Sequence, residues 1–212
     1  MSENPINGGS CKLNILVLVS GGGSNLQALL DAEKTGVLPS GAKIAAVISD
    51  RSGAYALERA KAAGIPASVE KPDLGLSKPE RRRELSSRIL RLCREMQISL
   101  IVHAGFLSIL AGDIIDEYSG RMINIHPALL PKYGGQGMYG IHVHRAVLAA
   151  GESESGCTVN LVEAGIDTGQ ILLQRRVPVL PGDSPEALAE RVLREEHIAI
   201  VEAVRLVINQ IQ

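Results

Sequence analysis

An asparagine and a histidine stand two positions apart at the end of an apolar run, in the segment RMINIHPALLPKYGG over residues 121–135. If that run is a β-strand, side chains two positions apart point to the same face, so Asn124 and His126 lie side by side. Pro127 and Pro131 keep the following residues out of a helix and predict an irregular loop. An amide N–H can stabilise an oxyanion and an imidazole can exchange a proton, so the pair suits acyl transfer.

A third polar group that could join this pair is Asp167, in the segment EAGIDTGQ. Its carboxylate stands in a glycine-flanked turn between two strand-like segments, and a carboxylate beside His126 would favour the imidazolium form. Each residue also has a plainer interpretation, His126 as a core histidine bonded to a backbone group and Asp167 as a turn residue bonded to its own backbone. The sequence has no elbow serine and no cysteine beside a base, so it favours transfer without a covalent intermediate.

A glycine-rich stretch, VSGGGSNLQ over residues 19–27, is a second candidate site. Three glycines after a buried strand let the backbone approach a ligand, and the following helix N-terminus offers unpaired N–H groups to a phosphate. A tight turn capped by Ser24 explains the same residues equally well. The dinucleotide fingerprint G-x-G-x-x-G needs a third glycine where Leu26 stands, so a Rossmann cofactor is disfavoured.

Metal and disulfide sites find little support in the sequence. His142 and His144 with Cys157 could suggest zinc, but HVHRAVLAAG indicates a helix, on which residues two apart do not share a face. Cys11, Cys93 and Cys157 are an odd number at unrelated spacings, which fits reduced thiols. We therefore predict no metal.

The elements that must position these residues alternate along the chain. Strands are predicted at 13–20, 42–49, 100–106 and 120–126, and helices at 25–36, 54–64 and 79–97. This alternation predicts an α/β fold with a Rossmann-like, mostly parallel sheet and helices on both faces. Two strand-like segments, 156–165 and 170–180, and a helix with Ser184 as N-cap and Pro185 at its first position then predict C-terminal antiparallel strands and a long terminal helix.

The composition bounds the class of protein. The 212 residues are 45% hydrophobic and 21% charged, with 22 Lys and Arg against 23 Asp and Glu. No basic field is available to hold nucleic acid, no apolar run approaches the roughly 18 residues that span a membrane, and the polar start lacks the features of a signal peptide. We expect one domain over residues 13–212 behind a loose extension of residues 1–12, a cytoplasmic location, no nucleic-acid or membrane partner, and a monomer or homodimer.

Several motifs together resemble the formyltransferases that use 10-formyltetrahydrofolate. NIHPALLPKY is typical of that superfamily, and SGGGSNLQALLDA, AGFLSIL, GIDTGQILLQRRVPV and EEHIAIVEAV resemble the phosphoribosylglycinamide formyltransferase family over nearly the whole chain from residue 13. The resemblance implies that 10-formyltetrahydrofolate is the co-substrate and that its formyl group passes to the amine of glycinamide ribonucleotide in purine synthesis. It implies direct attack by the amine through a tetrahedral intermediate.

Site residues follow from this resemblance by position. The implied catalytic residues are Asn124, His126 and Asp167, with His126 as the acid and base. The implied ribonucleotide contacts are Gly23, Ser24 and Asn25 to the phosphate and Glu196 to the ribose hydroxyls. The implied folate contacts are Leu107, Ser108, Ile109, Leu110 and Asn124 with the loop 163–167 around the pterin, and Lys78 near the folate tail.

Two positions depart from the commoner family pattern. Ser108 replaces a frequent arginine and Asn160 a frequent histidine, and the segment GGQGMYGIHVHR is longer than the shortest family loops and receives no role. Within the family, the alternatives are hydrolysis of 10-formyltetrahydrofolate and formylation of methionyl-tRNA, whose enzymes carry an extra domain for which this chain is expected to have no room. A non-enzymatic nucleotide-binding regulator would explain the glycine loop but leave Asn124, His126 and Asp167 without a purpose.

Overall fold

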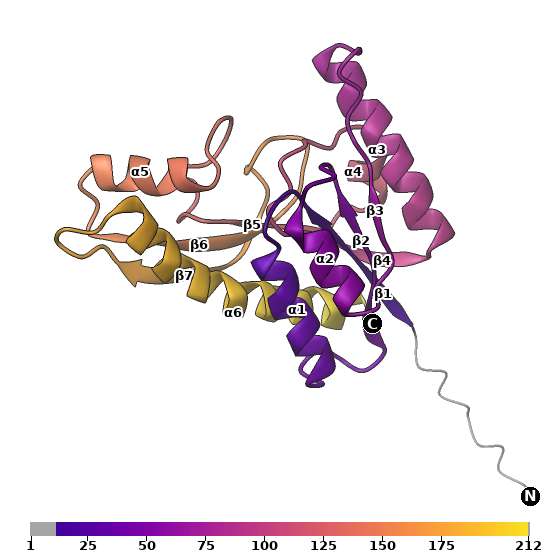
Figure 1. Ribbon diagram of the computed structural model, residues 1–212, viewed down its shortest axis with the longest axis horizontal. Helices are drawn as coiled ribbons and strands as arrows, with labels where there is room; N and C mark the ends of the chain where they lie inside the picture. The colour runs from indigo at the N-terminus through magenta and orange to yellow at the C-terminus, as the bar shows by residue number, and fades with distance from the viewer. Residues whose placement is uncertain (1–11, 212) are drawn as a thin grey trace, which may run out of the picture.

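The computed structural model describes residues 12–211, which form one seven-stranded sheet and six helices (Figure 1). The expected N-terminal extension, apart from Lys12, lies outside the described residues. In chain order the elements are β1 (Leu13–Val19), α1 (Ser24–Lys34), β2 (Ala42–Ser49), α2 (Tyr55–Ala62), β3 (Ala67–Val69), α3 (Lys78–Glu95), β4 (Ile98–His103), α4 (Asp113–Glu117), β5 (Met122–His126), α5 (Ile141–Ala149), β6 (Glu154–Leu161), β7 (Ile171–Pro178) and α6 (Pro185–Ile211).

The sheet has the strand order β3-β2-β1-β4-β5-β6-β7. The five strands from β3 to β5 are parallel, whereas β6 runs antiparallel to β5 and β7 antiparallel to β6. This confirms the predicted parallel sheet with antiparallel C-terminal strands. The chain moves outward from β1 to β3 and then returns to place β4 on the other side of β1. In open α/β sheets, ligands bind at the carboxyl ends of the strands where the order reverses, here between β1 and β4.

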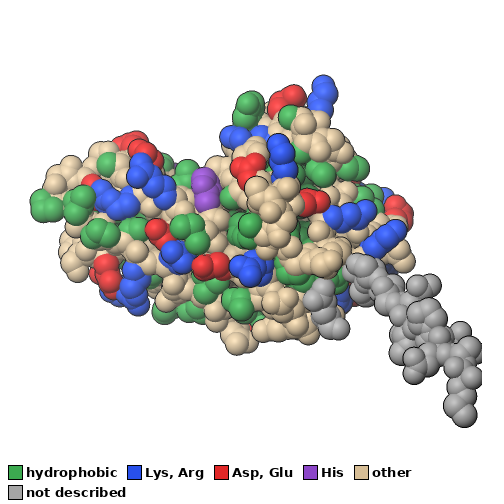
Figure 2. Space-filling model, turned by 90° about the horizontal axis from the view of Figure 1, so that it is seen from below, with side chains coloured by type: hydrophobic (Ala, Val, Ile, Leu, Met, Phe, Trp, Pro, Cys, Tyr) green, Lys and Arg blue, Asp and Glu red, His purple; other side chains and the backbone are tan. Residues whose placement is uncertain are grey.

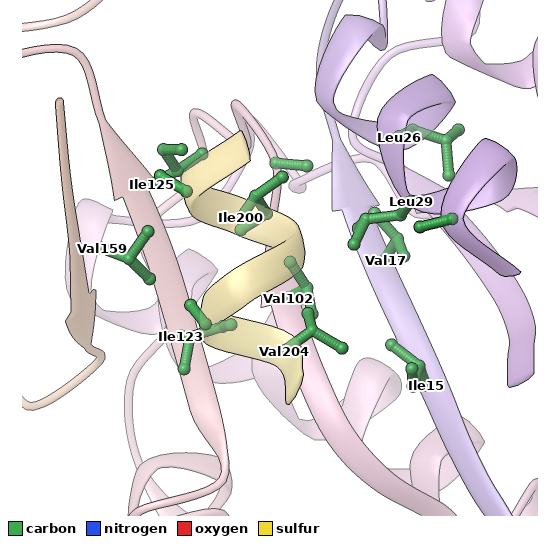
Figure 3. Packing of buried hydrophobic residues seen from close by; sticks show 14 of the residues in the cluster. Ile15, Val17, Leu26, Leu29, Val102, Ile123, Ile125, Val159, Ile200 and Val204 are labelled. Atoms are coloured by element: carbon green, nitrogen blue, oxygen red, sulfur yellow. The ribbon is translucent and has the colours of Figure 1, made fainter. Parts of the chain in front are cut away.

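Alternate residues of β1 divide the apolar core into two layers. Ile15 and Val17 pack with α1 and α6, while Leu16 and Leu18 pack with α3 and α4 on the opposite face. Figure 3 shows Ile200 and Val204 of α6 among the strand residues of the first layer. Helices therefore cover both faces, as the alternation of elements predicts.

Local signals fix several helix ends. A capping box between Ser77 and Glu80 begins α3, and Ser184 Oγ accepts the Ala187 N–H at 3.2 Å where α6 begins.

The short elements β3 and α4 are absent from the sequence predictions. They have three and five residues, too few for a hydrophobic period to develop, and all three residues of β3 are exposed at the edge of the sheet.

The surface carries both signs of charge. On the face seen in Figure 2, Lys and Arg side chains lie among Asp and Glu side chains, without a large area of one sign. Among the helices of residues 12–211, none is both long and apolar enough to cross a membrane.

Candidate active site

A cavity of about 600 Å³ lies at the carboxyl ends of β4 and β5. The residues that follow β1 and β4 meet next to it, because Ser20 Oγ accepts the Leu107 N–H at 2.8 Å. The cavity is therefore at the edge that the reversal of strand order predicts. Its lining includes these residues that the sequence singles out: Asn25, Leu107, Ser108, Ile109, Leu110, Asn124, His126, Asp167 and Glu196.

Asn124, His126 and Asp167 converge in this cavity. Asn124 and His126 share one face of β5, and Asp167 reaches them from the loop between β6 and β7. Asn124 Nδ2 lies 3.3 Å from Asp167 Oδ1, and His126 Nδ1 lies 3.6 Å from Asp167 Oδ2. One carboxylate therefore faces both polar groups of the strand.

His126 is held at one ring nitrogen and faces a carboxylate with the other. Its Nε2 lies 2.8 Å from the carbonyl oxygen of Tyr133, which can only accept, so Nε2 carries a hydrogen. Its Nδ1 faces the Asp167 carboxylate. Nδ1 and Asp167 Oδ2 are 3.6 Å apart, too far for a direct hydrogen bond, so no partner occupies Nδ1. The plainer interpretation of His126, a histidine bonded to a backbone group, thus holds at Nε2, and Nδ1 is the nitrogen left for proton exchange.

Asp167 does not bond its own backbone. Its φ of 56° puts it in the left-handed region, which is uncommon for residues other than glycine. The carboxylate oxygen Oδ2 accepts the Gly135 N–H at 2.9 Å, so it ties the β6–β7 loop to the loop after β5. The plainer interpretation of this residue as a self-bonded turn is therefore wrong.

The orientation of the Asn124 amide is fixed by a chain of contacts. Asn160 Nδ2 donates to the Leu161 carbonyl at 2.9 Å, which turns Asn160 Oδ1 toward Asn124 Nδ2 at 3.3 Å. Asn124 therefore presents its N–H₂ group to Asn160 and Asp167. Asn160, which stands where the family frequently has histidine, is 2% exposed and acts here as an acceptor.

The glycine loop has the features of an anion site. The N-cap of α1 is Gly23, with φ 71°, and no side chain caps the helix, so the alternative interpretation of this loop as a turn capped by Ser24 is wrong. The Gly21 carbonyl accepts the Ala56 N–H at 3.0 Å and the Gly22 carbonyl accepts Arg59 Nε at 2.8 Å. Because these carbonyls are occupied, the loop presents N–H groups at the positive end of the helix dipole.

Two of the expected ribonucleotide contacts line the cavity and two do not. Glu196 accepts Asn25 Nδ2 at 2.7 Å, and burial raises the pKa of the Glu196 carboxyl. Both side chains line the cavity, whereas Gly23 and Ser24 do not. The Asn25 amide is therefore committed to Glu196 through Nδ2, which was not predicted.

Most of the expected folate contacts also line the cavity, but Lys78 does not. Leu107 to Leu110 line the cavity, as do residues 165–167. Ser108 Oγ donates to Asp50 Oδ2 at 2.7 Å, so this serine anchors the loop after β4 to the end of β2. Lys78 is exposed, does not line the cavity, and lies on the first turn of α3, which projects from the molecule (Figure 1).

Several lining residues were missed by sequence reasoning, although the helical spacing of α5 could have indicated one of them. His144 is buried on α5 whereas His142 is exposed, as their spacing of two predicts. Burial, and then the charge of His126, lower the pKa of His144. The longer loop without a predicted role also lines the cavity. The missed lining residues include His103, Gly135, Met138, Tyr139 and His144.

The two cysteines of residues 12–211 are poor nucleophiles. Burial raises the pKa of Cys93 and of Cys157 to about 12, and both thiols are free. Over residues 12–211, no cluster of three or more His, Cys, Asp or Glu side chains has the arrangement of a metal site.

Comparison with known proteins decides the family. The sequence profile of the formyl transferase family matches residues 13–204. The chain belongs to the formyl transferase family. Among its formyl transferase relatives, the phosphoribosylglycinamide formyltransferase of Escherichia coli is 40% identical over 185 residues, covering 87% of this chain and 82% of that protein.

Two further relatives show how the domain is used elsewhere. The crystal structure of glycinamide ribonucleotide transformylase 1 from Symbiobacterium toebii superposes with a TM-score of 0.81 at 40% identity, covering 92% of this chain and 86% of that one. The trifunctional purine biosynthetic protein adenosine-3 of Drosophila melanogaster is 40% identical over 195 residues. That match covers 92% of this chain but only 14% of the trifunctional protein, so the chain corresponds to one part of it.

Proposed function

We propose that this chain transfers the formyl group of 10-formyltetrahydrofolate to the amine of glycinamide ribonucleotide. The convergence of Asn124, His126 and Asp167 on one cavity carries the proposal. The same cavity offers Asn25 with Glu196 for a ribonucleotide and the loop from Leu107 to Leu110 for a pterin. The high identity to the Escherichia coli relative supports the choice of substrates.

The reaction is acyl transfer by direct attack. The amine attacks the formyl carbon, a new C–N bond forms, and the carbonyl electron pair moves to oxygen, which leaves an oxyanion and a positive nitrogen. The amine nitrogen then loses a proton, N10 of the folate gains one, and the C–N10 bond breaks. The net proton movement is from the amine to N10, so no redox partner is needed.

The chain's residues act on these charges. An Asn124 N–H stabilises the oxyanion once it turns from one of its two long contacts, and an imidazolium at His126 adds a positive charge beside it. Proton exchange runs through Nδ1, since the Tyr133 carbonyl holds Nε2. Asp167 orients both groups and stabilises the positive charge on the ring. Buried, unreactive thiols fit this route without a covalent enzyme intermediate.

At the ribonucleotide, we assign the phosphate to the N–H groups of Gly23 and Ser24 and the ribose hydroxyls to Glu196. A carboxylate accepts hydrogen bonds from hydroxyls, and the site beside Asn25 is sheltered from water. We place the reaction in the cytoplasm, in a monomer or homodimer, because buried free thiols are compatible with a reducing compartment.

The test is an assay of formyl transfer with purified protein, glycinamide ribonucleotide and 10-formyltetrahydrofolate. We expect tetrahydrofolate to appear only when the amine is present, with formylglycinamide ribonucleotide in equal amount. Omitting the amine measures hydrolysis, and replacing it with methionyl-tRNA measures the other activity known in this family. Release of formate at the same rate without the amine, or formylation of the tRNA alone, would contradict the proposal.

A further inference from the structure

The orientation of His126 depends on a carbonyl that is itself held in an uncommon conformation. His126 Nε2 lies 2.8 Å from the Tyr133 carbonyl oxygen, and Tyr133 has a φ of 58°. This left-handed region is unfavourable for a residue with a Cβ, and it persists only where surrounding contacts enforce it. The contacts that hold Tyr133 in place therefore also hold His126.

Glu152 supplies such contacts from the turn between α5 and β6. Its Oε1 accepts the hydroxyl of Tyr133 at 2.8 Å and the ammonium group of Lys132 at 2.9 Å. One carboxylate oxygen thus binds two consecutive side chains of the loop after β5. The bond from Lys132, and then the bond from Tyr133, lower the pKa of the Glu152 carboxyl, so this acceptor is ionised near pH 7.

The beginning of the same loop is fixed from the sheet instead. Leu130 donates its N–H to Thr158 Oγ1 at 3.0 Å, and its carbonyl accepts Gln174 Nε2 at 2.9 Å. These two partners lie on β6 and β7. In the described part of the chain, Glu152 is the only side chain that forms a hydrogen bond with the side chain of Tyr133. The end of the loop therefore depends on Glu152.

A plain surface ion pair does not account for Glu152. The Lys132 side chain is 66% exposed, and ion pairs at such exposure contribute little to stability. The Glu152 side chain is 25% exposed, and Tyr133 packs against the apolar core. Glu152 and Tyr133 also line a second cavity of about 200 Å³. The bond to Tyr133 is therefore the sheltered one, and it leads directly to His126.

We propose that Glu152 is a positioning residue for formyl transfer. By holding the Tyr133 side chain, it directs the Tyr133 carbonyl at His126 Nε2, so the neutral imidazole keeps its hydrogen on Nε2 and its lone pair on Nδ1. Nδ1 is then the atom that takes up the proton lost by the amine. Without Glu152 the hydrogen can move to Nδ1, and those molecules lack the base. The inference rests on the proposed function, but the tautomer can be measured without substrate.

The test is Glu152→Ala, which removes the acceptor of both bonds. In single-turnover formyl transfer with both substrates saturating, we expect the rate to fall about three- to tenfold, as the loss of one hydrogen bond predicts. The Kd values of 5-formyltetrahydrofolate, a stable isomer of the co-substrate, and of glycinamide ribonucleotide should stay within twofold. Glu152→Gln keeps an oxygen that can accept both bonds, so it should recover most of the rate.

Glu154→Ala is the matched control. Glu154 lines the same small cavity and forms an ion pair with Arg176, but it does not bond the loop after β5. Its removal should leave the single-turnover rate within twofold of the parent. If Glu152→Ala does not fold, Tyr133→Phe removes the sheltered bond and keeps the ring. It should slow the chemical step by a similar factor, with both Kd values unchanged.

The ring tautomer of His126 gives a direct spectroscopic readout. In protein labelled with ¹⁵N-histidine, at a pH where the ring is neutral, the parent should show a protonated Nε2 and an unprotonated Nδ1. Glu152→Ala should show a mixture of the two tautomers. An unchanged single-turnover rate in a folded Glu152→Ala protein, or a His126 tautomer that stays the same, would overturn the inference. A parent that transfers no formyl group would instead remove the proposed function, and the tautomer alone would then decide whether Glu152 positions His126.

Discussion

Substitutions in the glycine loop can test ribonucleotide binding separately from the stability of the fold. A Cβ at Gly23 would lie 2.6 Å from Ala56 Cβ and 2.8 Å from Ala56 Cα, at a φ of 71°. The left-handed backbone costs about 1–2 kcal/mol and the overpacking about 1–3 kcal/mol for an alanine there. We expect Gly23→Ala to lower the melting temperature by roughly 5–15 °C, since 1 kcal/mol shifts a domain of this size by about 2–4 °C. Gly23→Val, the obvious choice from the sequence, would therefore mix loss of fold with loss of binding.

Gly22→Ala is the cleaner perturbation. A Cβ there meets nothing within 4 Å and the backbone is not left-handed, so stability should change by less than about 0.5 kcal/mol. The methyl group occupies space at the positive end of α1, where the ribonucleotide phosphate should approach. Losing one hydrogen bond to a charged group costs about 1.5–3 kcal/mol, so the ribonucleotide Kd should rise roughly tenfold to a hundredfold.

The assay is calorimetry with each substrate separately. Gly22→Ala should weaken glycinamide ribonucleotide and leave 5-formyltetrahydrofolate unchanged. Gly53→Ala is the control, because a Cβ at Gly53 also meets nothing within 4 Å and this turn lies outside the loop. A folded Gly22→Ala protein that binds the ribonucleotide as the parent does would refute the phosphate assignment.

Three further predictions follow from the same geometry. By mass-action linkage, 5-formyltetrahydrofolate should raise the melting temperature and NAD or NADP should not; the reverse pattern would indicate a dinucleotide site. His103 is protonated below about pH 6.5 in the unfolded chain but only below about pH 4 in the folded chain. The free energy of unfolding should therefore decrease as the pH is lowered from about 6.5 to about 4, by up to ~3 kcal/mol from this residue. Urea melts at several pH values should show that the free energy of unfolding of His103→Leu depends less steeply on pH than that of the parent. The remaining pH dependence would come from His144 and His197, whose pKa values burial also lowers, and an equal pH dependence in the two proteins would contradict the lowered pKa of His103. Asn160→Leu should free the Asn124 amide to rotate and lower kcat by about fivefold with KM nearly unchanged, as a hydrogen bond of about 1 kcal/mol implies; steady-state kinetics that show only a raised KM would count against this role.

The sequence predicts the parts of the site that depend on local periodicity. Asn124 and His126 share a face because side chains on a strand repeat every two residues, and they lie at the carboxyl edge because the prolines end β5. The alternation of strands and helices likewise predicts the parallel sheet. These features require no knowledge of which segments meet in space.

The remaining features depend on contacts between distant segments. The Tyr133 carbonyl reaches His126 only because the loop after β5 turns back, with Tyr133 itself at a φ of 58°. His103 appears in the site because β4 happens to pair with β5 in this register. Gly23 packs against Ala56 of a different helix. Lys78 is the first residue of α3, a helix that projects from the molecule. Periodicity carries no information on such pairings.

The central claim is that His126 and Asp167 act as one unit in formyl transfer. The most direct measurement is single-turnover formyl transfer in the parent, His126→Ala, Asp167→Asn and the double variant, with both substrates saturating. Each single variant should slow the chemical step by about 10²–10⁴-fold, and the double variant should be little slower than His126→Ala, because groups that act together are not additive. If the two losses multiplied in the double variant, or if Asp167→Asn weakened substrate binding with the single-turnover rate intact, the account would be contradicted.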